Sequence, residues 1–229
     1  MMPRSRLYAR PVPANPRLTL AEQWHALLKE QIISARYLPG QFLQESTICA
    51  DLGMGRTPVR QALQRLGQDG LVDVIHRKGV IVRWDSLTEL LLALEARILV
   101  EPYCAAKCAE RASSSDVATL AALYREYLEA RENGDRHKLM EIDWKMHVLF
   151  GMAASNYLLI ELLRPIQERM LRLWFLPHWQ VNDFGETANE HDKLIRAICE
   201  HRPEAASAAM KTHLESLKHR IVSGQGAGA

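Results

Sequence analysis

The chain has 229 residues, a length expected for one large domain or two small ones. Apolar residues make up 48% and charged residues 24%, which is typical of a globular protein and excludes collagen-like, low-complexity and wholly disordered chains. The apolar stretch Leu90–Leu94 is interrupted by Glu95, so no transmembrane helix and no membrane partner are expected. Because no secretory apolar segment follows Met1 and the cysteines form no CxxC pair, we expect a cytoplasmic protein without disulfides.

The net charge of +2 conceals an asymmetry along the chain. Residues 1–84 carry 12 Lys and Arg against 6 Asp and Glu, whereas residues 85–229 carry 17 against 21. A basic N-terminal part followed by an acidic C-terminal part indicates a nucleic-acid-binding module joined to a second domain. A basic surface that only favours solubility is the alternative.

Residues 1–17 combine four Pro and four Arg with no acidic residue, which predicts a disordered basic arm. Residues 18–84 then alternate helical and β-prone segments. Their apolar spacing and turn signals predict helices over 19–35, 46–52 and 56–69 and strands over 71–75 and 80–83. Thr19 and Ser46 are expected to cap the first two helices. Three helices followed by a β-hairpin form a winged helix-turn-helix.

The rest of the chain is expected to be entirely helical. Turn signals and helical periodicity predict six helices, over 87–111, 114–133, 135–154, 156–177, 183–201 and 203–221. Residues 87–222 therefore form an all-α six-helix bundle, and the Gly- and Ala-rich tail 223–229 is expected to be disordered. The fold class is mainly α, with a small β-hairpin wing in the N-terminal domain.

The helix expected at 56–69 has an apolar face and a polar face. The apolar positions are Val59, Leu63 and Leu66. The polar face carries Arg56, Thr57, Arg60, Gln61 and Gln64, and the hairpin turn adds His76, Arg77 and Lys78. Arg pairs with guanine and Gln with adenine in the major groove, and basic wing residues suit phosphate or minor-groove contacts. The pattern predicts a double-stranded DNA partner; an ordinary solvated helix face is the alternative.

Four side chains in the helical part have the chemistry of metal ligands. Asp143 and His147 lie four residues apart on one predicted helix, and His191 and His213 lie on two later helices. Each is embedded in apolar periodicity that directs it toward the bundle interior. Three imidazoles and a carboxylate suit a divalent Zn, Ni, Mn or Fe ion. From the spacing alone, hydrogen-bonded core histidines are the alternative.

The N-terminal motif resembles the GntR family of bacterial transcription regulators. The matching residues are Pro39-Gly40, Leu52-Gly53-Met54-Gly55-Arg56-Thr57-Pro58-Val59-Arg60-Gln61-Ala62-Leu63, Asp69-Gly70-Leu71-Val72 and Arg77-Lys78-Gly79-Val80-Ile81-Val82. The resemblance implies DNA contacts by Arg56, Thr57, Arg60, His76, Arg77 and Lys78. Two departures bear on operator preference. Gly55 stands where the family usually has Ser or Thr, and Ser46 stands where many members have a DNA-contacting Arg.

The C-terminal part resembles the FCD domain of the FadR subfamily, in its shorter VanR-like branch. The matching pieces are Arg97, Leu99, Glu101-Pro102, Asp143-x3-His147, Glu190-His191-x3-Ile195 and Met210-x2-His213. In that family the Asp and three His positions hold a divalent metal, and the effector is usually a small organic acid. The resemblance therefore implies a metal at Asp143, His147, His191 and His213.

A carboxylate effector on that metal needs further contacts. By the resemblance, Arg97 is expected to grip it bidentately, although an ion pair with Glu101 four residues on is an equal alternative. Trp174 is expected to form a pocket wall, or alternatively plain core. Asn189, two residues before His191, is expected to support the ligand set.

The function expected from these features is a metabolite-responsive repressor that binds a palindromic operator as a homodimer. It would release the operator on binding a small carboxylic or sugar acid. One alternative is a metal that serves stability only. Another, a metal-dependent hydrolase or isomerase, is disfavoured because no second general base accompanies the site. Glu190 is next to His191, but adjacent helical side chains point about 100° apart.

Overall fold

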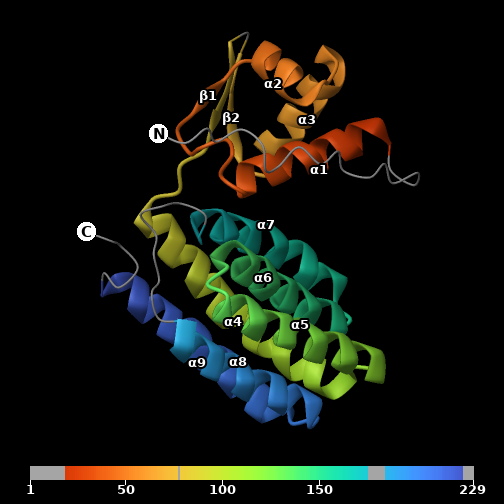
Figure 1. The fold of residues 1–229 in the computed structure, drawn as a ribbon, viewed down its shortest axis with the longest axis vertical. Coiled ribbons are helices and arrows are strands. Elements are labelled where there is room, and N and C mark those ends of the chain that lie inside the picture. The colour runs from red at the N-terminus through yellow and green to blue at the C-terminus, as the bar shows by residue number, and fades with distance from the viewer. Residues whose placement is uncertain (1–18, 77, 175–183, 224–229) are drawn as a thin grey trace. The chain divides into compact units, whose positions relative to one another are not determined.

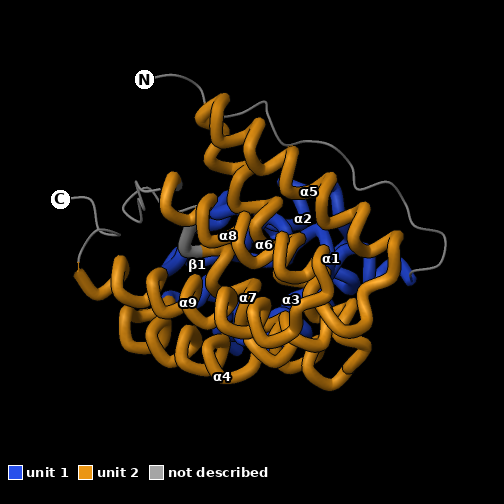
Figure 2. The backbone as a smooth tube through the Cα atoms, turned by 90° about the horizontal axis from the view of Figure 1, so that it is seen from below, with its two compact units in different colours: residues 1–84 blue, residues 85–229 orange. Residues whose placement is uncertain are grey.

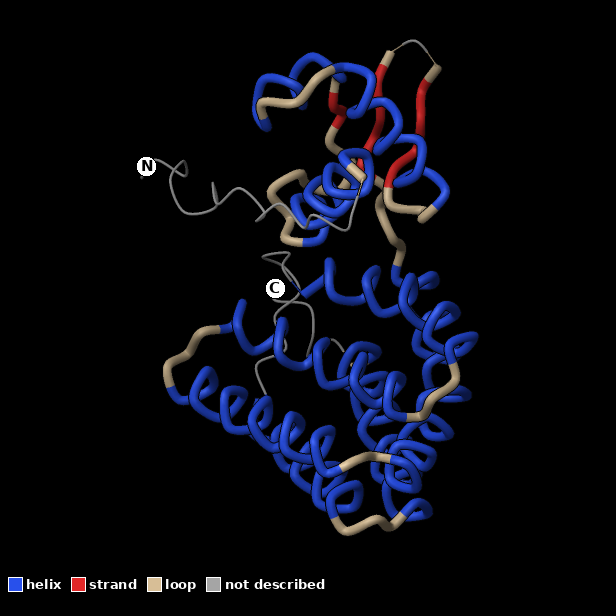
Figure 3. The backbone as a smooth tube through the Cα atoms, turned by 90° about the vertical axis from the view of Figure 1, so that its right-hand side faces the viewer, coloured by secondary structure: helices blue, strands red, loops and turns tan. Residues whose placement is uncertain are grey.

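The computed structural model describes residues 19–76, 78–174 and 184–223. The chain divides into two compact units, Met1–Trp84 and Asp85–Ala229 (Figure 2). Helices dominate both units, and the strands form one small antiparallel sheet (Figure 3), which confirms the predicted fold class. Within the described ranges, no helix has the length and apolar character needed to cross a membrane.

The N-terminal unit is a helix-turn-helix with a three-stranded sheet (Figure 1). Its elements are α1 (Leu20–Ile33), β1 (Phe42–Leu43), α2 (Glu45–Leu52), α3 (Arg56–Gln68), β2 (Val72–Ile75) and β3 (Gly79–Val82). Strand β3 lies between β1 and β2 and is antiparallel to both. Strand β1 was not predicted, because a strand of two residues is too short to display a period.

Local capping chemistry explains where the first helices begin. Thr19 caps α1 as predicted and forms a capping box with Glu22. The expected cap at Ser46 is wrong: α2 begins one residue earlier, with Gln44 at the N-cap and no side-chain cap hydrogen bond. The apolar faces of the amphipathic helices then pack together. Helix α1 packs on α3, and the fully buried Leu28 and Val59 belong to the same apolar core.

Gly79 is required where the wing meets β1. Its φ of 148° lies in a region that L side chains rarely adopt. A Cβ atom at this position would lie 2.3 Å from the carbonyl oxygen of Leu43, the β1 residue paired with Val80. Only glycine therefore allows β3 to approach β1 this closely.

The C-terminal unit consists of helices, as predicted. They are α4 (Leu87–Arg111), α5 (Ser114–Glu132), α6 (Arg136–Ala153), α7 (Tyr157–Trp174), α8 (Phe184–Cys199) and α9 (Pro203–Val222). Helix α4 is central, because it packs against α6, α7, α8 and, most extensively, α9. The expected arm 1–17, the end of the helix expected to reach residue 177, and tail residues 224–229 lie outside the described residues.

Candidate metal centre

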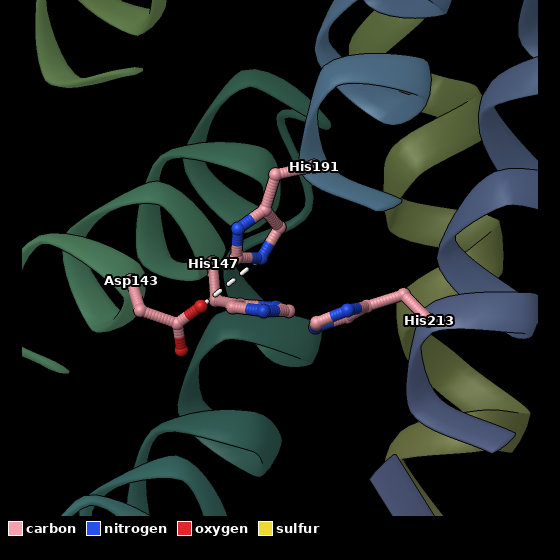
Figure 4. A group of neighbouring side chains, drawn as sticks. All are labelled: Asp143, His147, His191 and His213. Carbon is pink, nitrogen blue, oxygen red and sulfur yellow. Dashed lines mark ion pairs between the residues drawn. The ribbon is translucent and has the colours of Figure 1, made fainter. Parts of the chain in front are cut away.

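Three helices bring the four predicted ligand residues together. Asp143 and His147 come from α6, His191 from α8 and His213 from α9 (Figure 4). One ligand atom from each lies within 4.8 Å of the others. His191 Nε2 lies 3.0 Å from Asp143 Oδ1. A carboxylate and three imidazoles thus converge on one point inside the bundle.

The hydrogen bonding of this cluster fits a cation. The three histidines are buried, whereas the Asp143 side chain keeps 23% of its surface exposed. His147 Nε2 and both ring nitrogens of His191 are buried without a hydrogen-bond partner among the described residues. Buried polar atoms are normally satisfied, so unpaired nitrogens facing a carboxylate call for a missing partner. A divalent ion would supply that partner, and the donor set suits Zn, Ni, Mn or Fe.

Two glutamates hold the far nitrogens of two of these rings. His147 Nδ1 donates to Glu101 Oε2 at 2.6 Å, and His213 Nδ1 donates to Glu190 Oε2 at 2.9 Å. Neither contact was predicted from the sequence. The side chain of Glu190 diverges from that of His191 on the same helix, and this divergence places it beside His213 of another helix. The available signal was an acidic residue in an apolar stretch, as at Glu101 between Val100 and Pro102.

The electrostatics favour the metal-binding protonation states of Asp143 and His213. Burial alone would raise the pKa of Asp143, but the adjacent imidazoles of His191, His147 and His213 hold it well below its usual range. Burial likewise opposes ionisation of Glu190, but His213, Ser216 and Arg220 lower its pKa to about 2. Burial lowers the pKa of His213 to about 4, against the opposing effect of Glu190. Ionised carboxylates and a neutral imidazole are the states that coordinate metals.

A small pocket lies against the cluster. It is lined by Arg97, Asp143, Trp144, His147, Gln167, Met170 and Leu171. Arg97 is buried and forms the alternative contact named from its sequence, an ion pair with Glu101 in which Arg97 Nε lies 2.6 Å from Oε1. Arg97 thus faces the pocket and holds Glu101 at the same time.

Asn189 and Trp174 are the other two residues that were expected to contact the effector. Asn189 is exposed, because two residues along a helix correspond to a turn of about 200° from His191. This position does not support the expected role of Asn189 beside the ligands. Trp174 ends α7, and its side chain lies outside the described residues.

The predicted DNA-contacting residues lie at the surface. The exposed ones are Arg56, Thr57, Arg60, Gln61, Gln64, His76 and Lys78, and Arg77 lies outside the described residues. Arg60 is oriented by Glu45, which accepts from its Nε at 3.1 Å and from a terminal nitrogen at 3.0 Å. Gly55 at the N-cap of α3 has no side chain, so the first backbone N–H groups of α3 receive no hydrogen bond from a capping side chain.

A helix-turn-helix with an exposed polar helix, joined to a helical unit with an interior ligand cluster, is the architecture of a DNA-binding regulator. Residues 20–82 match the bacterial regulatory proteins of the gntR family, and residues 92–216 match the FCD domain. The chain therefore belongs to the GntR family of transcriptional regulators and carries an FCD domain, which confirms the resemblance.

Curated relatives and solved structures agree with this assignment. The chain is 28% identical over 216 residues to the galactonate operon transcriptional repressor of Escherichia coli K12, covering 85% of this chain and 93% of the relative. It is 27% identical over 219 residues to the Uxu operon transcriptional regulator of the same organism, covering 86% and 84%. The solved structure of E. coli McbR/YncC has the same fold, with a TM-score of 0.81 at 21% identity and coverage of 90% and 98%.

We expect Ni²⁺ or Zn²⁺ to raise the melting temperature of the full chain and EDTA to reverse the effect. A metal at about 100 times its dissociation constant adds roughly 2.7 kcal/mol to the free energy of unfolding, or several degrees. The increment should disappear in His213→Ala and persist in His219→Ala, which changes an exposed histidine of the same helix. Equal metal increments in both variants would exclude His213 as a ligand.

Proposed function

We propose that this protein is a metabolite-responsive repressor. It binds a palindromic double-stranded DNA operator as a homodimer and releases it when a small carboxylic or sugar acid reaches a divalent metal held by Asp143, His147, His191 and His213. The observation that carries the proposal is the convergence of these four side chains beside a pocket that contains an arginine. The name of the galactonate operon repressor, a relative along most of both chains, supports a sugar acid as the effector class.

The chemistry of the pocket supports an anionic effector. A bound Zn, Ni, Mn or Fe ion would act as a Lewis acid for a carboxylate oxygen, and four protein ligands leave two positions of an octahedral ion for exogenous ligands. Asp143 supplies only one negative charge to a doubly charged ion, so the centre attracts an anion. Arg97, which lines the pocket, offers guanidinium N–H donors to the incoming carboxylate.

DNA recognition rests on the exposed polar face of α3. Its residues Arg56, Thr57, Arg60, Gln61 and Gln64 offer donors and acceptors suited to base edges in the major groove. The uncapped N-terminus of α3 suits a phosphate, and Lys78 and His76 of the wing suit the DNA backbone. The two hydrogen bonds to Glu45 restrict the Arg60 side chain, which limits the conformational freedom lost on binding.

Homodimer formation is supported by an exposed apolar surface on α4 and α7. The start of the unit, Asp85, contacts Arg172 near the end of α7, while Cys104 packs with Leu163 farther along. The two helices therefore run antiparallel. Each helix carries two exposed apolar residues spaced four apart, and we name these four residues the α4–α7 surface: Leu99 and Tyr103 on α4, and Leu158 and Leu162 on α7.

The exposure of this surface is unusual for a monomer. Leu99 has 80% of its surface exposed, and Leu158 and Leu162 have more than half exposed. Exposed apolar side chains on two packed helices favour an association surface, and a two-fold operator calls for a second copy of the same chain.

Coupling between the pocket and DNA is supported by the contacts of α7. Gln167, Met170 and Leu171 of α7 line the pocket. Arg169 and Arg172 of the same helix form ion pairs with Asp85, the first residue of the C-terminal unit. An effector that shifts α7 therefore shifts the point where the chain enters the DNA-binding unit, which provides the differential contact that allosteric release requires.

The proposal is tested with DNA from upstream of the protein's own gene, in gel shifts with a panel of aldonic, uronic and simple carboxylic acids. We expect a retained complex that one class of acid releases, with release abolished by EDTA. Arg56→Ala should weaken DNA binding by about 1–3 kcal/mol, while Arg125→Ala, at an exposed position of α5, should not. Strong destabilisation by EDTA without any release by acids would leave the metal a structural role only.

The dimer is tested by Leu99→Glu, which places a charge on the α4–α7 surface. We expect sedimentation to show a shift from dimer to monomer and a matching loss of operator affinity. Leu20→Glu introduces the same change at an exposed leucine of the other unit and should leave the mass unchanged. A Leu99→Glu dimer as tight as that of the unmodified protein would rule out this surface.

The coupling route is tested by Asp85→Asn, which weakens both ion pairs to α7. Effector affinity should remain, while the ratio of effector affinities measured with and without operator should fall toward one. Glu95→Gln changes a residue of α4 and removes its surface ion pair with Lys218 of α9. This variant should preserve the ratio of effector affinities. An unchanged ratio in a folded Asp85→Asn protein would place the coupling elsewhere.

A further inference from the structure

A buried chain of charged groups stands behind His147. Arg97 Nε donates to Glu101 Oε1 at 2.6 Å, and Glu101 Oε2 accepts from His147 Nδ1 at 2.6 Å. Gln167 Nε2 from α7 donates to the first of these carboxylate oxygens at 3.1 Å. Glu101 keeps only 2% of its surface exposed, so each of its hydrogen bonds operates in a low-dielectric interior. We name Arg97, Glu101 and His147 the first relay.

A second chain with the same order stands behind His213. Arg220 donates from one terminal nitrogen to Glu190 Oε1 at 3.3 Å, and Glu190 Oε2 accepts from His213 Nδ1 at 2.9 Å. The other terminal nitrogen of Arg220 donates to Thr187 Oγ1 at 3.3 Å. Arg220 and His213 are buried, and Glu190 keeps only 9% of its surface exposed. We name Arg220, Glu190 and His213 the second relay.

The two relays reach the cluster with matched geometry. The rings of His147 and His213 lie with their centroids 5.5 Å apart and their planes only 27° from parallel. Each ring is held at Nδ1 by a carboxylate on its far side, and His147 Nε2 is left without a protein partner. His191 differs, because its nitrogens have no hydrogen-bond partner in the described structure and its close contact is with Asp143.

We propose that Glu101 and Glu190 are positioning residues for the metal ligands. Each carboxylate accepts the Nδ1 proton of its histidine, which fixes the tautomer with a free lone pair on Nε2 and fixes the ring plane. Each arginine donates to the other oxygen of its glutamate, so the carboxylate behind each histidine is held from both sides. The inference deepens the proposed metal site and rests on that function.

The charge of each relay explains why glutamate is needed. An Arg–Glu pair contributes no net charge, so neither relay opposes a divalent cation. Replacing Glu101 with Gln would leave Arg97 uncompensated and would add a positive charge behind a metal ligand. It would also replace the charged carboxylate acceptor, which makes the imidazole more basic, with a neutral amide. Both changes weaken metal binding while the shape of the side chain is kept.

The first test reads the tautomers directly. In the metal-free full chain, ¹⁵N NMR of the histidines should show His147 and His213 protonated at Nδ1, with assignment from the His147→Gln and His213→Gln spectra. In Glu101→Gln, the Nδ1–H preference of His147 should decline while that of His213 remains. A purely structural Arg97–Glu101 pair would leave the tautomers unchanged. An Nε2–H form of both rings in the unmodified protein overturns the inference.

The second test measures Ni²⁺ affinity by calorimetry. Glu101→Gln and Glu190→Gln should each weaken binding by about 10–100-fold. Glu110→Gln is the matched control, because this exposed glutamate of α4 pairs with Lys107 at the surface and should not alter the affinity. If Glu101→Gln does not fold, the double variant Arg97→Gln/Glu101→Gln removes both charges and should still bind Ni²⁺ more weakly.

The outcomes distinguish metal binding itself from the positioning role of Glu101 and Glu190. Absence of Ni²⁺ and Zn²⁺ binding in the unmodified chain would overturn the metal role and this inference with it. Tight binding in the unmodified chain, together with equal affinity in folded Glu101→Gln and Glu190→Gln, would overturn only the positioning role. Loss of affinity with a changed tautomer supports both.

Discussion

The ion pair between Arg97 and Glu101 is the contact on which the interior of the helical unit depends. Glu101 is nearly inaccessible to solvent, and a buried carboxylate is tolerated only when charged and hydrogen-bonding partners surround it. Arg97 on the same helix, His147 on α6 and Gln167 on α7 supply those partners. The hydrogen bonds to the Glu101 carboxylate therefore connect three helices and orient the ring of His147.

Helix α7 links several functions in this arrangement. One part of it contacts the carboxylate behind the ligand cluster through Gln167, and its arginines hold Asp85 at the start of the unit. Its first turns carry Leu158 and Leu162 of the α4–α7 surface. Under the proposed function, a ligand-dependent movement of this helix would reach both the α4–α7 surface and Asp85 at the start of the unit.

Comparison of the predicted and observed elements shows where sequence periodicity is informative. The amphipathic spacing in α3 correctly separated buried Val59, Leu63 and Leu66 from the exposed polar face, because a helix repeats every 3.6 residues whatever surrounds it. Strand β1 has no such period. It forms by pairing with β3, and the missing side chain of Gly79 allows the two strands to approach each other. The start of α2 differed from prediction for a related reason, since Gln44 rather than Ser46 occupies the N-cap.

The sequence by itself determined the helical faces, the identity of the four ligand-type residues and the direction of each toward the bundle interior. These properties depend on spacing within one helix. Only the tertiary structure decided which groups stand behind the ligands. Glu101 meets His147 across two helices, and Glu190 meets His213 across two others, at separations of 46 and 23 residues. Packing of separate helices creates such contacts, and the period of a single helix contains no information about its neighbour.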